Sequence, residues 1–148
     1  MLADRLKMPI EKLVGYAKVL GINVDKSTEE IRYDMKIAAK KNPESKLILS
    51  GDSAGGGLCL ALMMRLRDEG HKLPDGAVLF SPWTNLTCES ESYVTLAKAD
   101  PMLSPIMAIK CADFYAPPPI EKNNPYISPI FGDFSDLPRT LIMVGGQE

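Results

Sequence analysis

A serine set among glycines is the strongest chemical signal in the sequence. Gly51, Asp52, Ser53, Ala54 and Gly55 match the pattern G-x-S-x-G, in which a sharp turn from a strand into a helix exposes a serine hydroxyl. At such a turn the serine is strained, and a side chain in place of Gly51 or Gly55 would clash with neighbouring backbone. The pattern therefore predicts that Ser53 is a nucleophile for acyl transfer.

The residues after Ser53 predict where an acyl-transfer intermediate would be stabilised. The Ala54 N–H should lie at the N-terminus of a helix, where the helix dipole and unpaired N–H groups favour an oxyanion. Gly56 extends the glycine run of this predicted elbow. A glycine-rich turn with a structural serine is the alternative, but an apolar run on each side gives the context that the motif requires.

The base that Ser53 would need is missing from the sequence. His71 is the only histidine, and serine hydrolases usually take their general base from histidine. A helix predicted over residues 58–69 would carry the chain about 18 Å away from the serine turn. A base must come within about 3 Å of the hydroxyl. We therefore predict that His71 is a solvated loop residue.

Alternating apolar runs predict an α/β fold with a parallel sheet around this turn. The predicted strands are 46–50, 76–82 and 139–146, and the predicted helices are 9–20, 28–41, 58–69 and 107–115. Three strands are few for a parallel sheet, which needs neighbours on both edges and cover on both faces. The unpaired edges therefore suggest self-association.

Composition favours one soluble domain without a cofactor. The chain has 148 residues, 45% of them hydrophobic and 24% charged, and a net charge of −2, which disfavours nucleic-acid binding. No apolar run reaches the roughly 18 residues that span a membrane, and the N-terminus lacks a signal peptide, so we expect a cytoplasmic protein. Cys59, Cys88 and Cys111 are expected to be buried free thiols rather than a disulfide or zinc site, and no metal or organic cofactor is implied.

Several blocks, in order, resemble the hormone-sensitive-lipase-like carboxylesterases, a branch of the α/β-hydrolase fold. They are GDSAGGGLCLAL, LPDGAVLFSPWTNLT, ADPMLSP and NPYISPIFGDFSDLPRTLIMVGGQE, and the resemblance covers roughly residues 27–148. It implies a serine esterase that cleaves small-molecule carboxylic esters through an acyl-enzyme on Ser53. It also places Glu148 at the position of the catalytic acid, where the alternative is a loop carboxylate at a frayed terminus.

Two parts of the family pattern are absent. Residues 1–50 contain neither a histidine nor a Gly-Gly pair, so the family's His-Gly-Gly oxyanion segment is not found, and no histidine follows Glu148. Residues 1–26 are an atypical helical N-terminus. We therefore expect residues 1–148 to form a single incomplete α/β-hydrolase domain, a truncated chain that is weakly active or inactive alone. Trp83 could shape an acyl pocket, but core packing is the favoured interpretation.

Two other functions stay open at this point. The first is a non-catalytic interaction module on an α/β-hydrolase scaffold, which would bind another chain through its unpaired sheet edges. The second is nucleotide binding at the glycine-rich turn. The turn lacks both the lysine of a P-loop and the spacing of G-x-G-x-x-G, so the signal for a nucleotide is weak.

Overall fold

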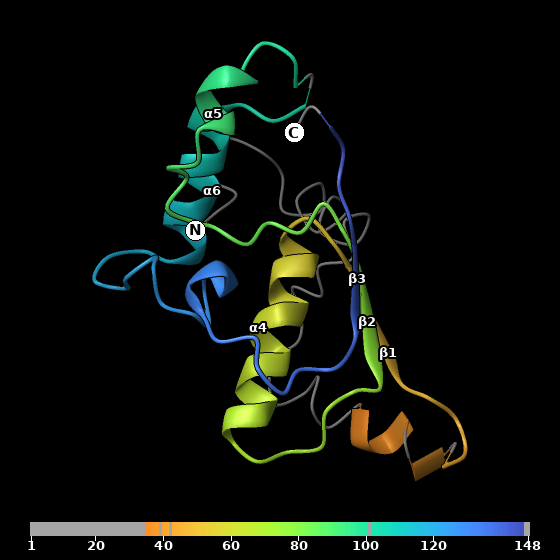
Figure 1. Cartoon of the computed structure of the whole chain (residues 1–148). Coiled ribbons are helices and arrows are strands. Elements are labelled where there is room, and N and C mark those ends of the chain that lie inside the picture. The colour runs from red at the N-terminus through yellow and green to blue at the C-terminus, as the bar shows by residue number, and fades with distance from the viewer. Residues whose placement is uncertain (1–34, 39, 42, 101, 147–148) are drawn as a thin grey trace, which may run out of the picture.

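A parallel three-stranded sheet lies along one side of the part of the chain that the structure describes (Figure 1). The computed structural model describes residues 35–38, 40–41, 43–100 and 102–146. The strands are β1 (Ile48–Asp52), β2 (Gly76–Phe80) and β3 (Thr140–Met143), paired in the order β1-β2-β3. The predicted α/β class and parallel sheet are confirmed, with strand ends that differ from the predicted ones by a few residues.

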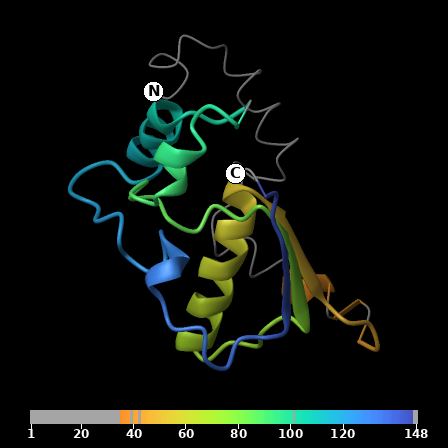
Figure 2. The same cartoon turned by 45° about the horizontal axis from the view of Figure 1, so that its top comes forward.

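Helix α4 (Ala54–Asp68) packs on one face of this sheet, mainly against β1 (Figure 2). Leu60 and Met63 of α4 form a buried cluster with Ala77 and Leu79 of β2. The helix begins directly after Ser53, so the prediction of a start at residue 58 was wrong. Glycine has a low helix propensity, but at positions 56 and 57 of α4 close packing against Pro82 and Trp83 leaves no room for a larger side chain.

The other end of α4 is closed by a glycine cap. Gly70 has a φ of 68° and donates its N–H to Arg67 O, while the His71 N–H donates to Leu66 O at 2.7 Å. These two bonds form a Schellman motif, which satisfies carbonyl groups in the last turn of a helix. The cap ends α4 and fixes His71 at the end of the helix that lies away from Ser53.

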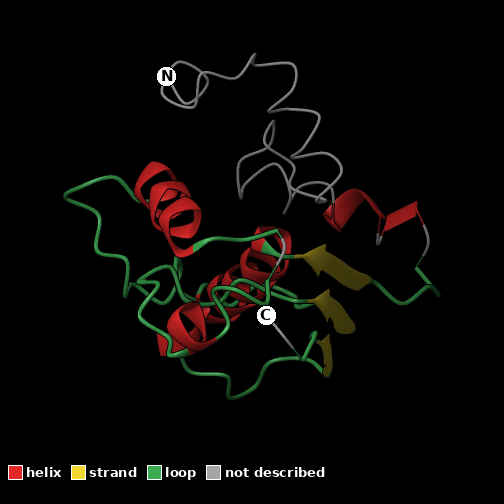
Figure 3. Cartoon of the chain, turned by 90° about the horizontal axis from the view of Figure 1, so that it is seen from above, coloured by secondary structure: helices red, strands yellow, loops and turns green. Residues whose placement is uncertain are grey.

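Two helices lie beyond the carboxyl ends of the strands (Figures 1 and 3). They are α5 (Ser92–Thr95) and α6 (Pro105–Tyr115). The short helix η1 (Pro129–Phe131) packs against α4. Helix α6 starts two residues earlier than predicted because Ser104 caps it and Pro105 suits its first turn. The elements α5 and η1 are too short to leave a periodic pattern in sequence.

The face of the sheet that points away from α4 is apolar and open among the described residues. The strand register places Ile48, Phe80, Leu141 and Met143 on this face, where they are 50%, 42%, 55% and 42% exposed. The predicted helix 9–20 lies outside the described residues. Of the predicted helix 28–41, residues 35–38 and 40–41 are helical and residues 28–34 are not described.

Candidate active site

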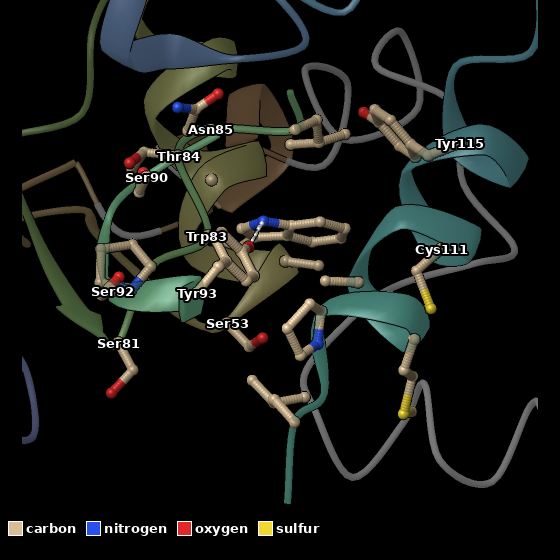
Figure 4. Close-up of a pocket in the computed structure, with 18 of the residues that line it drawn as sticks. Ser53, Ser81, Trp83, Thr84, Asn85, Ser90, Ser92, Tyr93, Cys111 and Tyr115 are labelled. Atoms are coloured by element: carbon tan, nitrogen blue, oxygen red, sulfur yellow. Dashed lines mark hydrogen bonds between the residues drawn. The ribbon is translucent and has the colours of Figure 1, made fainter. Parts of the chain in front are cut away.

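The residues that follow the three strands meet in one cleft. Ser53, Ser81 and Val144 come directly after β1, β2 and β3, and all three line a cleft of about 870 Å³ (Figure 4). The strands are parallel, so their carboxyl ends lie at the same edge of the sheet. Ligands of open α/β sheets bind at this edge.

The backbone of Ser53 is held in a strained conformation by bonds to both of its peptide groups. Its φ of 53° and ψ of −121° lie in a region that favours glycine. The Ser53 N–H donates to Phe80 O at 2.9 Å, and its carbonyl accepts the N–H groups of Gly56 and Trp83 at 3.0 and 2.9 Å. Strain of this kind persists only where the surroundings impose it, and it is concentrated at functional sites.

Glycines allow the backbone to approach itself closely around Ser53. A Cβ on Gly51 would lie 2.4 Å from Gly55 O, and one on Gly57 would lie 2.2 Å from Trp83 O. A Cβ on Gly56 would lie 2.7 Å from Pro82 Cβ. The predicted clash at Gly51 is therefore confirmed. Gly55 is buried in the same turn, and the clash predicted there stays a prediction.

The hydroxyl of Ser53 is not used to cap α4. Ser53 occupies the N-cap position, where a serine oxygen usually accepts an N–H of the first turn, yet its side chain makes no capping bond. Figure 4 shows the side chain pointing into the cleft. Ala54 is the first residue of α4, so its N–H belongs to the group without an intrahelical acceptor. Ser53 and Ala54 both line the cleft.

The opposite wall of the cleft comes from α5, α6 and the segment between them. This wall is mostly apolar, and its larger side chains are Tyr93, Leu96, Leu103, Met107, Phe114 and Tyr115. Cys111 of α6 also lines it. A mostly apolar cleft with few polar groups is typical of sites for small organic ligands.

A hydrogen bond joins the two aromatic side chains nearest the centre of Figure 4. The indole Nε1–H of Trp83 donates to the Tyr93 hydroxyl at 3.1 Å. Burial, followed by the neighbouring Cys88 thiol, raises the pKa of Tyr93 to about 12. The phenol therefore stays neutral over the ordinary pH range. Trp83 lines the cleft rather than joining the buried cluster of α4 and β2, so the favoured prediction of core packing was wrong.

Comparison with known proteins identifies the family. Residues 22–148 match the family described as the alpha/beta hydrolase fold. The chain belongs to this family, and the proteins to which it is similar include some named hormone-sensitive lipase. The resemblance stated from the sequence is thereby confirmed over a range that begins slightly earlier than expected.

Curated and solved proteins are similar to a large part of the chain. An acetyl-hydrolase of Streptomyces hygroscopicus is 39% identical over 106 residues, which are 72% of this chain and 35% of that protein. An esterase of Acinetobacter venetianus is 41% identical over 103 residues, 69% of this chain and 34% of that protein. A hormone-sensitive lipase from a metagenome library has a TM-score of 0.76 at 32% identity, covering 84% of this chain and 43% of that one. The chain thus spans about a third of the length of these curated relatives.

The structure places His71 away from Ser53. His71 follows the C-terminal end of α4, a 15-residue helix whose length is about 22 Å, and its Nε2 is 3.4 Å from Glu69 Oε2. The structure thus separates His71 from Ser53, as predicted. Glu148 lies outside the described residues, so its role stays a prediction.

The cysteines are free, as predicted, but they are only half-buried. Cys59, Cys88 and Cys111 form no disulfide, and burial raises the pKa of each thiol. Among the described residues, no group of three or more histidine, cysteine or acidic side chains could hold a metal ion. The same residues contain no helix with the length and apolar character needed to cross a membrane.

Two residues of the site were missed in the sequence. Gly57 resembles any helix residue after the motif, but it is the position where α4 touches the Trp83 carbonyl. The run of glycines at residues 55–57 could have indicated that other parts of the chain approach this backbone closely at more than one position. Tyr93 gave no signal, because its partner Trp83 is ten residues away along an irregular segment.

Proposed function

We propose that this chain provides the nucleophile and one oxyanion donor of a carboxylic ester hydrolase. The observation that carries the proposal is the strained Ser53, whose hydroxyl is not used to cap α4 and points into an apolar cleft at the carboxyl edge of the sheet. The names of the relatives, acetyl-hydrolase and esterase, support a small ester as substrate. A cytoplasmic location and the absence of a nucleic-acid partner stay predictions.

The chemistry proceeds through an acyl-enzyme. Ser53 Oγ attacks the ester carbonyl and loses its proton to a histidine base, while the Ala54 N–H stabilises the oxyanion. The alcohol leaves with that proton, and water then attacks the acyl group and releases the acid and the Ser53 hydroxyl. His71 lies at the wrong end of α4, so the mechanism needs a histidine on another polypeptide segment. Each oxyanion donor that an enzyme of this kind lacks typically reduces its rate by about 10²–10³-fold.

Glu148 is the proposed acid that orients this histidine. Gly145 lines the cleft two residues after β3, and three residues of extended chain span at most about 11 Å. Glu148 can therefore lie near the cleft. A carboxylate hydrogen-bonded to the imidazole would hold the tautomer that accepts the serine proton.

The test is a chimera with one matched control. In the Acinetobacter venetianus esterase, the matched 103 residues are replaced by the corresponding part of this chain, and hydrolysis of p-nitrophenyl butyrate is measured. We expect turnover that falls by about 10⁶-fold in Ser53→Ala. Ser50→Ala, which removes an exposed hydroxyl from β1, should leave turnover unchanged. Turnover that survives Ser53→Ala would refute the proposal. The 148-residue chain alone should be nearly inactive.

A second candidate is the non-catalytic interaction module. One observation favours it: β3 is exposed on both faces, with Leu141, Ile142 and Met143 between 42% and 55% exposed. Apolar side chains at a sheet edge promote association with another chain. Light scattering of the purified chain distinguishes the two, since a monodisperse monomer would count against the module.

A further inference from the structure

The indole of Trp83 forms a wall of the cleft beside Ser53. In Figure 4 the ring lies across the middle of the cleft and extends toward the side where Cys111 and Tyr115 of α6 lie. The Trp83 N–H donates to the Ser53 carbonyl, so the residue that carries the indole is bonded directly to the nucleophile's backbone. The indole therefore limits the space next to Ser53 at a fixed place.

Tyr93 holds this indole in place. A half-buried indole N–H in a mostly apolar cleft needs an acceptor, and the Tyr93 hydroxyl supplies one at 3.1 Å. The indole is thus fixed from α5 as well as from its own backbone.

We propose that Tyr93 is a positioning residue that fixes Trp83 as the wall limiting the length of the alkyl chain bound beside Ser53. The ligand class is a straight-chain alkyl group, which fits the apolar lining contributed by Leu103, Met107 and Ala108. The proposal rests on the proposed esterase function only in taking this group to be part of an ester. Binding of the alkyl chain itself needs no turnover.

The experiment uses the fluorescence of Trp83, which is the only tryptophan in the sequence. Its emission therefore reports on the cleft without interference from another site. Straight-chain 1-alkanols of increasing length are titrated into the full chain, and the dissociation constants are taken from the change in emission. Each methylene that the cleft buries should tighten binding about fourfold. For alkanols longer than the Trp83 wall allows, a further methylene should no longer tighten binding.

Tyr93→Phe keeps the ring and removes only the hydroxyl that holds the indole. We expect the gain in affinity to continue to longer alkanols, so the first alkanol beyond the wild-type limit binds at least about fourfold more tightly. Acrylamide should also quench Trp83 more strongly in this variant. Thr95→Val is the matched control, because it removes an exposed hydroxyl from α5, outside the cleft, and leaves the partner of Trp83 in place. It should keep the wild-type limit.

Two results would overturn the proposal. One is the same chain-length limit in Tyr93→Phe as in the wild type, and the other is emission that does not respond to any alkanol. If Tyr93→Phe is unfolded by circular dichroism, Trp83→Phe replaces it, and affinity is taken from the rise in Tm with each alkanol. That variant shortens the wall directly, so an unchanged limit there also overturns the proposal.

The outcome is separable from that of the esterase proposal. A changed limit in Tyr93→Phe, together with no effect of Ser53→Ala on turnover of the chimera, would support the wall and reject the esterase. An unchanged chain-length limit in Tyr93→Phe, together with turnover that depends on Ser53, would reject the wall and support the esterase.

Discussion

At the scale of single residues, the elbow depends on a glycine that has no room for a methyl group. Gly51→Ala would place a Cβ 2.4 Å from Gly55 O, a backbone atom that cannot rotate away. We expect a loss of about 1–3 kcal/mol in the free energy of unfolding, measured by urea denaturation. Gly146→Ala is the control, since no atom lies within 4 Å of the added methyl group. A Gly51→Ala chain as stable as this control would show that the turn can open.

The raised pKa of Tyr93 predicts a loss of stability in alkali. Its folded pKa of about 12 lies above the ordinary value of 10, so the neutral phenol is favoured in the folded state. This contribution is complete below pH 10 and is lost as the pH rises through 12. The free energy of unfolding should therefore fall between pH 10 and 12 less steeply in Tyr93→Phe than in the wild type. Equal slopes would contradict the assignment.

The sequence allowed some of these residues to be predicted and not others. Gly51, Ser53 and Ala54 were predictable because the elbow is local: strand, turn and helix are contiguous in the chain. Gly57 and Tyr93 were not, because their roles depend on Trp83, which reaches them only through the packing of the turn after β2. No periodic pattern links residues across such an irregular segment.

At the scale of elements, helix α6 depends on its cap to form one wall of the cleft. The Ser104 side chain accepts the Met107 N–H at 3.2 Å, and loss of such a cap typically costs about 1 kcal/mol. We expect Ser104→Ala to lower the free energy of unfolding by about this amount in urea. Ser104→Asp retains a capping oxygen and should match the wild type. Equal losses in both variants would show that the cap contributes nothing.

The elements themselves were only partly predictable. The three strands were found because each is a short apolar run, and α6 was found approximately. The start of α4 was misplaced because glycines at 55–57 indicate a break when considered locally, whereas the Pro82–Trp83 turn leaves no room for a side chain at Gly56 and Gly57 inside the helix. Tertiary packing therefore overrides local propensity in the helix that follows Ser53.

At the scale of the whole molecule, the open face of the sheet predicts which apolar residues tolerate charge. Leu141 is 55% exposed on β3, so Leu141→Lys should change the free energy of unfolding by at most about 0.5 kcal/mol. A lysine at a sheet edge should also reduce self-association in light scattering. Leu79→Lys, at a fully buried position of β2, should abolish folding. If Leu141→Lys unfolds as well, this face is covered in the protein.

One carbonyl oxygen ties the nucleophile to the rest of the site. The Ser53 carbonyl accepts N–H groups from Gly56, Gly57 and Trp83, and so joins the first turn of α4 to the turn after β2. A shift of Ser53 would therefore disturb both turns at once, and with them the backbone of Trp83.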